Sequence, residues 1–119
     1  MTYNDFRNIW FSALDYTDDQ RDLYRNERGW QTWMDEFGDD TAAIIYALDT
    51  IYDMAHMGCK GIRSVTGMTQ QAFGDAYGVP RRSVQNWELQ TRDVPLYTLM
   101  TLGYAVLSDS IQKLKLGEE

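Results

Sequence analysis

Apolar side chains recur along this chain at the spacing of an α-helix, and glycines interrupt the pattern at intervals. Phe6, Ile9, Trp10, Ala13 and Leu14 occupy positions i, i+3, i+4, i+7 and i+8 of the first such segment, so they share one helical face. The sequence lacks the sustained apolar–polar alternation of strands, and it contains no Asn-Gly or Asp-Gly hairpin turn. It therefore predicts an all-α protein that folds as a small helical bundle.

The segment between residues 17 and 38 predicts a second helix followed by one or two further turns. Thr17 and Gln20 match a capping box, in which a hydroxyl and an amide satisfy the first backbone N–H groups, and Gly29 marks the expected end of the helix. Gly38 ends the next segment, whose large apolar residues are Trp30, Trp33, Met34 and Phe37. We expect the aromatic side chains among them to pack in the core with those of residues 6 and 10.

A longer helix is predicted to follow, capped by Asp40 or Thr41. Its apolar stripe consists of Ile44, Ile45, Leu48, Ile51, Tyr52 and Ala55. Gly58 and Gly61 mark its expected end, and a short helix is expected around residues 62–66.

Four further boundaries are predicted in the second half of the chain. Thr69 is placed to cap a helix that stops at Gly78, because glycine readily takes a positive φ angle. Pro80 precedes a helix over about residues 81–89, where its missing N–H group costs little. Pro95 begins the final helix, which is apolar over much of its circumference.

Charge is distributed unevenly along the chain, which carries 18 acidic and 11 basic residues and a net charge of −7. Residues 1–59 have a balance of −8, residues 60–95 of +2 and residues 96–119 of −1. No Pro- or Ser-rich linker divides the chain, so we expect an acidic helical portion, 1–59, to pack against a second portion, 60–119. The single net-positive segment indicates divided roles rather than one uniform surface.

The sequence offers little support for catalysis, a cofactor or a membrane span. It contains neither a P-loop nor the glycine pattern of dinucleotide binding. His56 and Cys59, three residues apart, are too few for a zinc site or for a nucleophile with its orienting partner. No apolar run approaches the roughly 18 residues of a membrane helix, and the first residues do not match a signal peptide. We therefore expect a cytoplasmic protein that is not an enzyme and that uses no metal or other cofactor.

Residues 69–88, TQQAFGDAYGVPRRSVQNWE, carry the most specific spacing in the chain. Two helices that cross steeply over a tight turn need a small residue where they touch and a glycine where the chain reverses, which Gly74 and Gly78 supply. The expected inner, apolar face consists of Phe73, Tyr77, Val84 and Trp87.

The run TGMTQQAFGDAYGVPRRSVQNWE, with TRDVPLYTLMTL shortly after it, resembles the helix-turn-helix of the Xre/Cro family of bacterial and phage transcriptional regulators. The Met-Thr-Gln start, the Gly-Val-Pro turn and the Asn-Trp-Glu end carry the resemblance, which covers about residues 60–107. It implies a phage-repressor type of domain that binds double-stranded DNA as a homodimer at a palindromic operator, with the helix from Arg81 in the major groove. Such a protein regulates transcription, most often as a repressor.

The resemblance also implies roles for individual residues. Positions that face base edges in the family correspond to Arg81, Arg82 and Asn86, with Ser83 and Gln85 nearby. This agrees with chemistry, because arginine can donate two hydrogen bonds to guanine, and asparagine or glutamine can pair with adenine. Positions that contact or buttress the phosphate backbone correspond to Thr69, Gln70, Thr91 and Arg92.

Two departures from the family pattern bear on affinity and on the turn. The run Leu89-Gln90-Thr91-Arg92 stands where the family often has Gly-Lys-Arg, which removes a phosphate contact. Gly74 stands where alanine is more usual, at a cost of about 1 kcal/mol in helix propensity. With so few basic residues, the salt-dependent part of DNA affinity should be small.

A second interpretation of the same residues stays open. The chain could be a protein-binding inhibitor or adaptor, for example a phage-encoded protein that acts on a nucleic-acid enzyme. It would keep the helix-turn-helix as a scaffold and engage a basic partner with residues 1–59. The position of the acidic side chains discriminates between the two: acids beside the helix from Arg81 disfavour DNA binding, and acids on the far side favour it.

Overall fold

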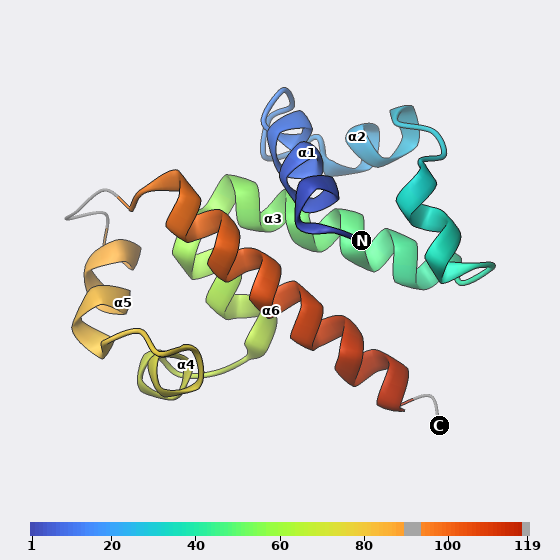
Figure 1. Ribbon diagram of the computed structural model, residues 1–119. Helices are drawn as coiled ribbons and strands as arrows, with labels where there is room; N and C mark the ends of the chain where they lie inside the picture. Colours follow the sequence, from blue (N-terminus) through green and yellow to red (C-terminus); the bar gives the residue numbers. More distant parts are fainter. Residues whose placement is uncertain (90–93, 118–119) are drawn as a thin grey trace.

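The computed structural model describes residues 1–89 and 94–117, and the regular structure of these residues is entirely helical (Figure 1). The helices are α1 (Tyr3–Ala13), α2 (Arg21–Glu27), the 3-10 helix η1 (Thr32–Phe37), α3 (Thr41–Thr66), α4 (Gln70–Tyr77), α5 (Arg81–Glu88) and α6 (Leu96–Gly117). No strand occurs in the described ranges. The expectation of an all-α bundle is confirmed.

The two longest helices, α3 and α6, cross each other, and α1 packs against both of them (Figure 1). Phe6 and Trp10 of α1 and Met54 of α3 are fully buried where the three helices meet. Gly103 of α6 faces them, and a Cβ atom there would lie 3.1 Å from Phe6 Cζ and 3.3 Å from Met54 Sδ. The absence of a side chain thus allows α6 to approach the core closely.

Helix α1 starts at a capping box formed by Thr2 and Asp5, and its predicted apolar face is buried except at its end. Leu14 follows the last helical residue and is half exposed, because the chain turns away from the core there.

The segment that follows departs from the sequence-based expectation in two places. The Thr17 N–H group donates to Gln20 Oε1 at 2.9 Å, but the Thr17 hydroxyl donates to Asp19, so only half of the predicted capping box forms. Helix α2 starts one residue after Gln20. Trp33 is buried as predicted, whereas Trp30 is 63% exposed and donates its indole N–H to Asp35 on the surface. Placing Trp30 in the core was therefore wrong.

Helix α3 is interrupted by a kink at Gly58, where its end was predicted. Asp40 caps it by accepting from the Ala43 N–H group at 3.1 Å, as one of the two expected caps. At Gly58 the backbone takes φ 64° and ψ −143°, but the helix resumes and continues to Thr66. The expected helix end is thus a kink, and the expected short helix is the last part of α3. Buried residues before and after the kink belong to one core.

Arginines of α2 offset part of the acidic charge of α3. Arg25 Nη1 lies 2.7 Å from Asp49 Oδ2, and Arg21 Nη1 lies 2.8 Å from Asp53 Oδ2. Burial nevertheless raises the pKa of Asp49, against the opposing influence of the two arginines. These pairs join α2 to α3 on the side of the molecule that carries α1.

Candidate nucleic-acid interface

Helices α4 and α5 are joined by a short turn whose hydrogen bonds are local. The Thr69 hydroxyl caps α4 by accepting from the Ala72 N–H group at 3.1 Å, as predicted. Gly78 ends the helix with φ 70°, and the N–H groups of Gly78 and Val79 both donate to the carbonyl of Gly74. The carbonyl of Pro80 then accepts the first hydrogen bonds of α5. The turn is therefore specified by the residues within it.

The tightest approach between the two helices occurs at Gly74, which is buried. A Cβ atom at this position would lie 2.4 Å from the carbonyl oxygen of Val79. Real Cβ atoms do not approach a backbone oxygen so closely, so Gly74 is required by the return of the chain after α4. The prediction that a small residue is needed where the two helices touch is therefore confirmed.

Apolar and polar contacts together hold α4 and α5 on the rest of the bundle. Phe73 and Val84 are fully buried, as predicted, whereas Trp87 is only partly buried against the core. Tyr77 packs on Phe73 with ring centroids 5.1 Å apart, and its hydroxyl donates to Asp109 of α6 at 2.9 Å. Burial, together with the neighbouring carboxylate, raises the pKa of Tyr77 to about 12. Helix α4 is therefore anchored to α6, and both α4 and α5 pack on α3.

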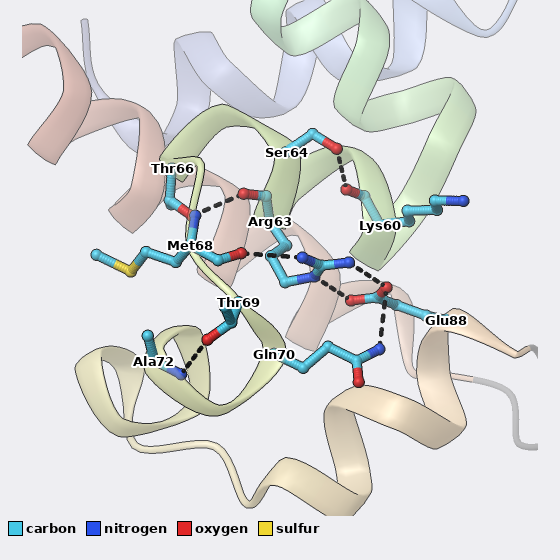
Figure 2. Close-up of polar contacts among 9 residues, drawn as sticks. All are labelled: Lys60, Arg63, Ser64, Thr66, Met68, Thr69, Gln70, Ala72 and Glu88. Carbon is cyan, nitrogen blue, oxygen red and sulfur yellow. Dashed lines mark hydrogen bonds and ion pairs between the residues drawn. The ribbon is translucent and has the colours of Figure 1, made fainter.

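A paired arginine and glutamate fix the end of α5 (Figure 2). Arg63 of α3 donates from Nε and Nη2 to the two carboxylate oxygens of Glu88, at 2.7 and 2.9 Å, and from Nη1 to the Met68 carbonyl at 2.9 Å. The Glu88 side chain is only 7% exposed. These hydrogen bonds hold the pKa of Glu88 below its usual range. The expectation that Glu88 is a structural hydrogen-bonding residue is confirmed.

Gln70, at the start of α4, also reaches this pair, since its Nε2 atom lies 3.4 Å from Glu88 Oε1 (Figure 2). Of the two roles that the resemblance implies for Gln70, a buttress and a phosphate contact, this geometry matches the buttress. Thr69 uses its hydroxyl to cap α4 but is exposed. The other two predicted phosphate contacts, Thr91 and Arg92, lie outside the described residues.

The residues predicted to face bases lie together on α5 but differ in exposure. Arg81 and Arg82 are exposed on its first turn, while Ser83, Gln85 and Asn86 are partly buried. Leu89, just after the helix, is 72% exposed. The two arginines are thus the most accessible polar groups of the predicted set.

Acidic residues of the first portion lie away from α5. Helices α1, α2 and η1 occupy one side of α3, and α4 and α5 the other (Figure 1). On α4 and α5 themselves the acidic residues are Asp75, which accepts from Gln71 at 3.0 Å, and Glu88, which is paired with Arg63. The exposed Lys60 also lowers the pKa of Glu88 through its charge. No unpaired carboxylate lies beside Arg81 and Arg82 among the described residues of these two helices.

Sequence reasoning missed the role of Arg63. It is separated from Glu88 by 25 positions, and no helical or turn spacing links residues so far apart. Only knowledge of how α3 packs on α5 could have paired them.

His56 and Cys59 make separate contacts. His56 Nε2 lies 2.9 Å from the Ala13 carbonyl oxygen, and its ring stacks on Tyr52 at 4.4 Å between centroids. Cys59 is buried, which raises the pKa of its thiol to about 11. Within the described ranges, no three His, Cys, Asp or Glu side chains group as metal ligands would. Those ranges also hold no helix with the length and hydrophobicity needed to cross a membrane.

Comparisons of the chain with protein families, with curated proteins and with solved structures found no match. The resemblance to the Xre/Cro family stays a prediction that rests on residues 60–107.

Proposed function

We propose that this protein is a sequence-specific DNA-binding regulator of transcription that inserts α5 into the major groove of double-stranded DNA. The observation that carries the proposal is the placement of Arg81 and Arg82. Both are exposed on the first turn of α5, and buried Val84 and the Arg63–Glu88 pair fix this helix to the rest of the protein. Specific readout needs donors held rigidly at a protruding helix, and this arrangement supplies them.

Arginine suits this role because its guanidinium group can donate two hydrogen bonds to O6 and N7 of guanine, and each such pair contributes about 1–3 kcal/mol of discrimination. Gln85 and Asn86 lie further along α5 and are partly buried, so their reach to bases would depend on how deeply the helix enters the groove. We therefore assign the leading role in base recognition to Arg81 and Arg82. In this proposal Gln70 acts indirectly, by supporting Glu88 and hence the end of α5.

The net charge of −7 is compatible with this function because the charges are separated in space. Most acidic residues of the first portion lie in the loop between α1 and α2 and in η1 with the turn after it, and Figure 1 shows both segments away from α5. At physiological ionic strength, exposed charges further apart than about 8 Å are largely screened from one another. The repulsion between these acidic residues and the DNA phosphates near α5 is therefore weakened. Because the chain has few basic residues, electrostatic steering of DNA toward the protein is also small.

A single copy of α5 offers few contacts, so the proposal includes a homodimer on a two-fold symmetric operator. In dimeric readers of this type, two recognition helices enter the major groove one turn of DNA apart, about 34 Å. Doubling the arginine contacts compensates for the small number of phosphate contacts on each subunit.

Selection of bound duplexes from a random DNA pool tests the proposal. We expect enrichment of a palindrome with guanines in each half-site, and we expect Arg81→Ala with Arg82→Ala to remove the enrichment. Arg7→Ala is the matched control, because Arg7 is an exposed arginine on α1. Failure of the wild-type protein to enrich any sequence would overturn the proposal.

The protein-binding alternative makes a different prediction in the same experiment. An adaptor that uses residues 1–59 would enrich no DNA. Charge-reversing changes at acidic residues of α1 and α2 would alter its binding to a protein partner, whereas changes on α5 would not. The separation of the acidic loop and η1 segments from α5 favours the DNA-binding proposal over this one.

A further inference from the structure

A cavity of about 370 Å³ lies between η1, the first turns of α3 and the C-terminal half of α6. Its place is the end of the bundle away from α5 (Figure 1). Much of its lining is apolar and comes from Ala42 and Ala43 of α3 and from Ile111 and Leu114 of α6. Both the volume and the apolar lining are typical of sites for small organic molecules.

Two aromatic side chains form further parts of the wall. Phe37, the last residue of η1, and Tyr46 of α3 both line the cavity. The Tyr46 hydroxyl is hydrogen-bonded to Ser110 of α6, which fixes the position of the ring between the two helices. Aromatic faces attract cations as well as apolar groups.

The charged residues among the described lining residues are two carboxylates, Glu36 and Asp40. Asp40 accepts the Ala43 N–H group as the cap of α3, and a carboxylate can accept further hydrogen bonds. Glu36 pairs with the amino group of Met1, which lines a smaller neighbouring cavity of about 190 Å³. This amino group and the positive end of the α3 dipole, about half a charge, offset only part of the two negative charges.

We propose that this cavity binds a small apolar organic cation, such as an arylalkylammonium. The apolar body would contact Ile111, Leu114 and the aromatic walls, and the ammonium group would lie next to Asp40. An anion of the same size would be repelled by the two carboxylates, and a neutral molecule could hydrogen-bond to them but would lack the charge–charge attraction. The site is independent of the proposed DNA contacts, because it lies at the other end of the bundle.

An NMR titration with three matched probes tests this site: naphthylethylammonium, naphthylethanol and naphthylacetate, which share an apolar body and differ in charge. We expect the cation to bind roughly three- to fivefold more tightly than the alcohol, as for a partly exposed ion pair, and the acetate to bind most weakly. The amide resonances of Ala43, Tyr46 and Ile111 should shift. Equal binding of cation and alcohol, shifts elsewhere in the protein, or no binding of the cation would overturn the proposal.

Three variants sharpen the test. Asp40→Asn removes the charge but keeps a good helix cap, so it should abolish the preference for the cation without unfolding the protein. Asp39→Asn removes an equal charge from the neighbouring exposed residue and should leave the preference intact. Ala42→Phe places a ring in the cavity and should remove binding of all three probes. Equal effects of the two aspartate variants would contradict a specific role for Asp40.

Discussion

Replacing Gly74 with alanine tests the structure of the α4–α5 turn. Two effects of opposite sign compete at this position. Alanine in place of glycine inside an exposed helix stabilises it by about 1 kcal/mol. At Gly74, however, the added Cβ would lie 2.4 Å from the Val79 carbonyl oxygen, and that oxygen belongs to the backbone of a hydrogen-bonded turn.

The steric effect should be the larger of the two. A backbone oxygen cannot swing away as a side chain can, so the turn itself must shift. Overpacking that forces such a shift costs typically 1–3 kcal/mol, and the hydrogen bonds of the turn that accept at Gly74 would weaken as well. We therefore expect Gly74→Ala to destabilise the protein by about 1–2 kcal/mol after the helix-propensity gain is included.

Gly103→Ala provides the matched control. Its Cβ would lie 3.1 Å from Phe6 Cζ and 3.3 Å from Met54 Sδ, which are ends of side chains rather than backbone. These atoms can move by a few tenths of an ångström, so the steric cost should be small. The gain in helix propensity should offset it and leave the stability nearly unchanged. Urea denaturation followed by circular dichroism measures both variants. A Gly74→Ala variant as stable as wild type would refute the close approach at the turn.

Three further predictions concern groups with perturbed pKa values. Glu88→Gln should destabilise the fold by about 1.5–3 kcal/mol at neutral pH, because Arg63 loses a charged partner. Since Arg63 lowers the pKa of Glu88, the stabilisation is present above the ordinary glutamate pKa and is lost as the pH falls through the lowered one; urea denaturation across acidic pH should show a flatter profile for the variant. Tyr77→Phe should cost about 1 kcal/mol by removing the hydrogen bond to Asp109, and it should remove a tyrosine that ionises near pH 12 in absorbance titrations. The buried Cys59 thiol, with its pKa of about 11, should react with a thiol reagent only as fast as the protein opens, and fast labelling in native buffer would contradict its burial.

Local signals in the sequence predicted many boundaries of the fold. Thr69 caps α4 and Asp40 caps α3, because each needs only its own side chain and an N–H group three residues on. Gly78 stops α4, because the positive φ angle of the turn favours glycine over every other residue. Such features depend on nearest neighbours in the chain and can be recognised without knowledge of tertiary packing.

Features that depend on distant residues were not predictable in this way. The chain breaks its helical geometry at Gly58, as the sequence indicated, but helical structure resumes directly afterwards and packs on α5, so Gly61 lies inside a helix rather than at its end. Trp30 is exposed because its indole N–H group bonds to Asp35, which composition alone cannot reveal. Tertiary context decides both cases.

The candidate interface was predictable to a similar degree. The spacing of Val84 and Trp87 indicated which side of α5 packs inward, and hence that Arg82 points outward. The bond between Gln70 and Glu88 and the role of Arg63 depend on how three helices meet, so no spacing in the sequence could indicate them.

The affinity of the selected DNA duplex for the double variant Arg81→Ala with Arg82→Ala is the most direct test of the central claim. Fluorescence anisotropy should show a loss of at least about 30-fold, if each arginine forms even a weak bidentate pair of about 1 kcal/mol. Arg7→Ala should bind within about twofold of wild type, and circular dichroism should confirm that all three proteins are folded. Wild-type affinity in the folded double variant would contradict the assignment of α5 as the recognition helix.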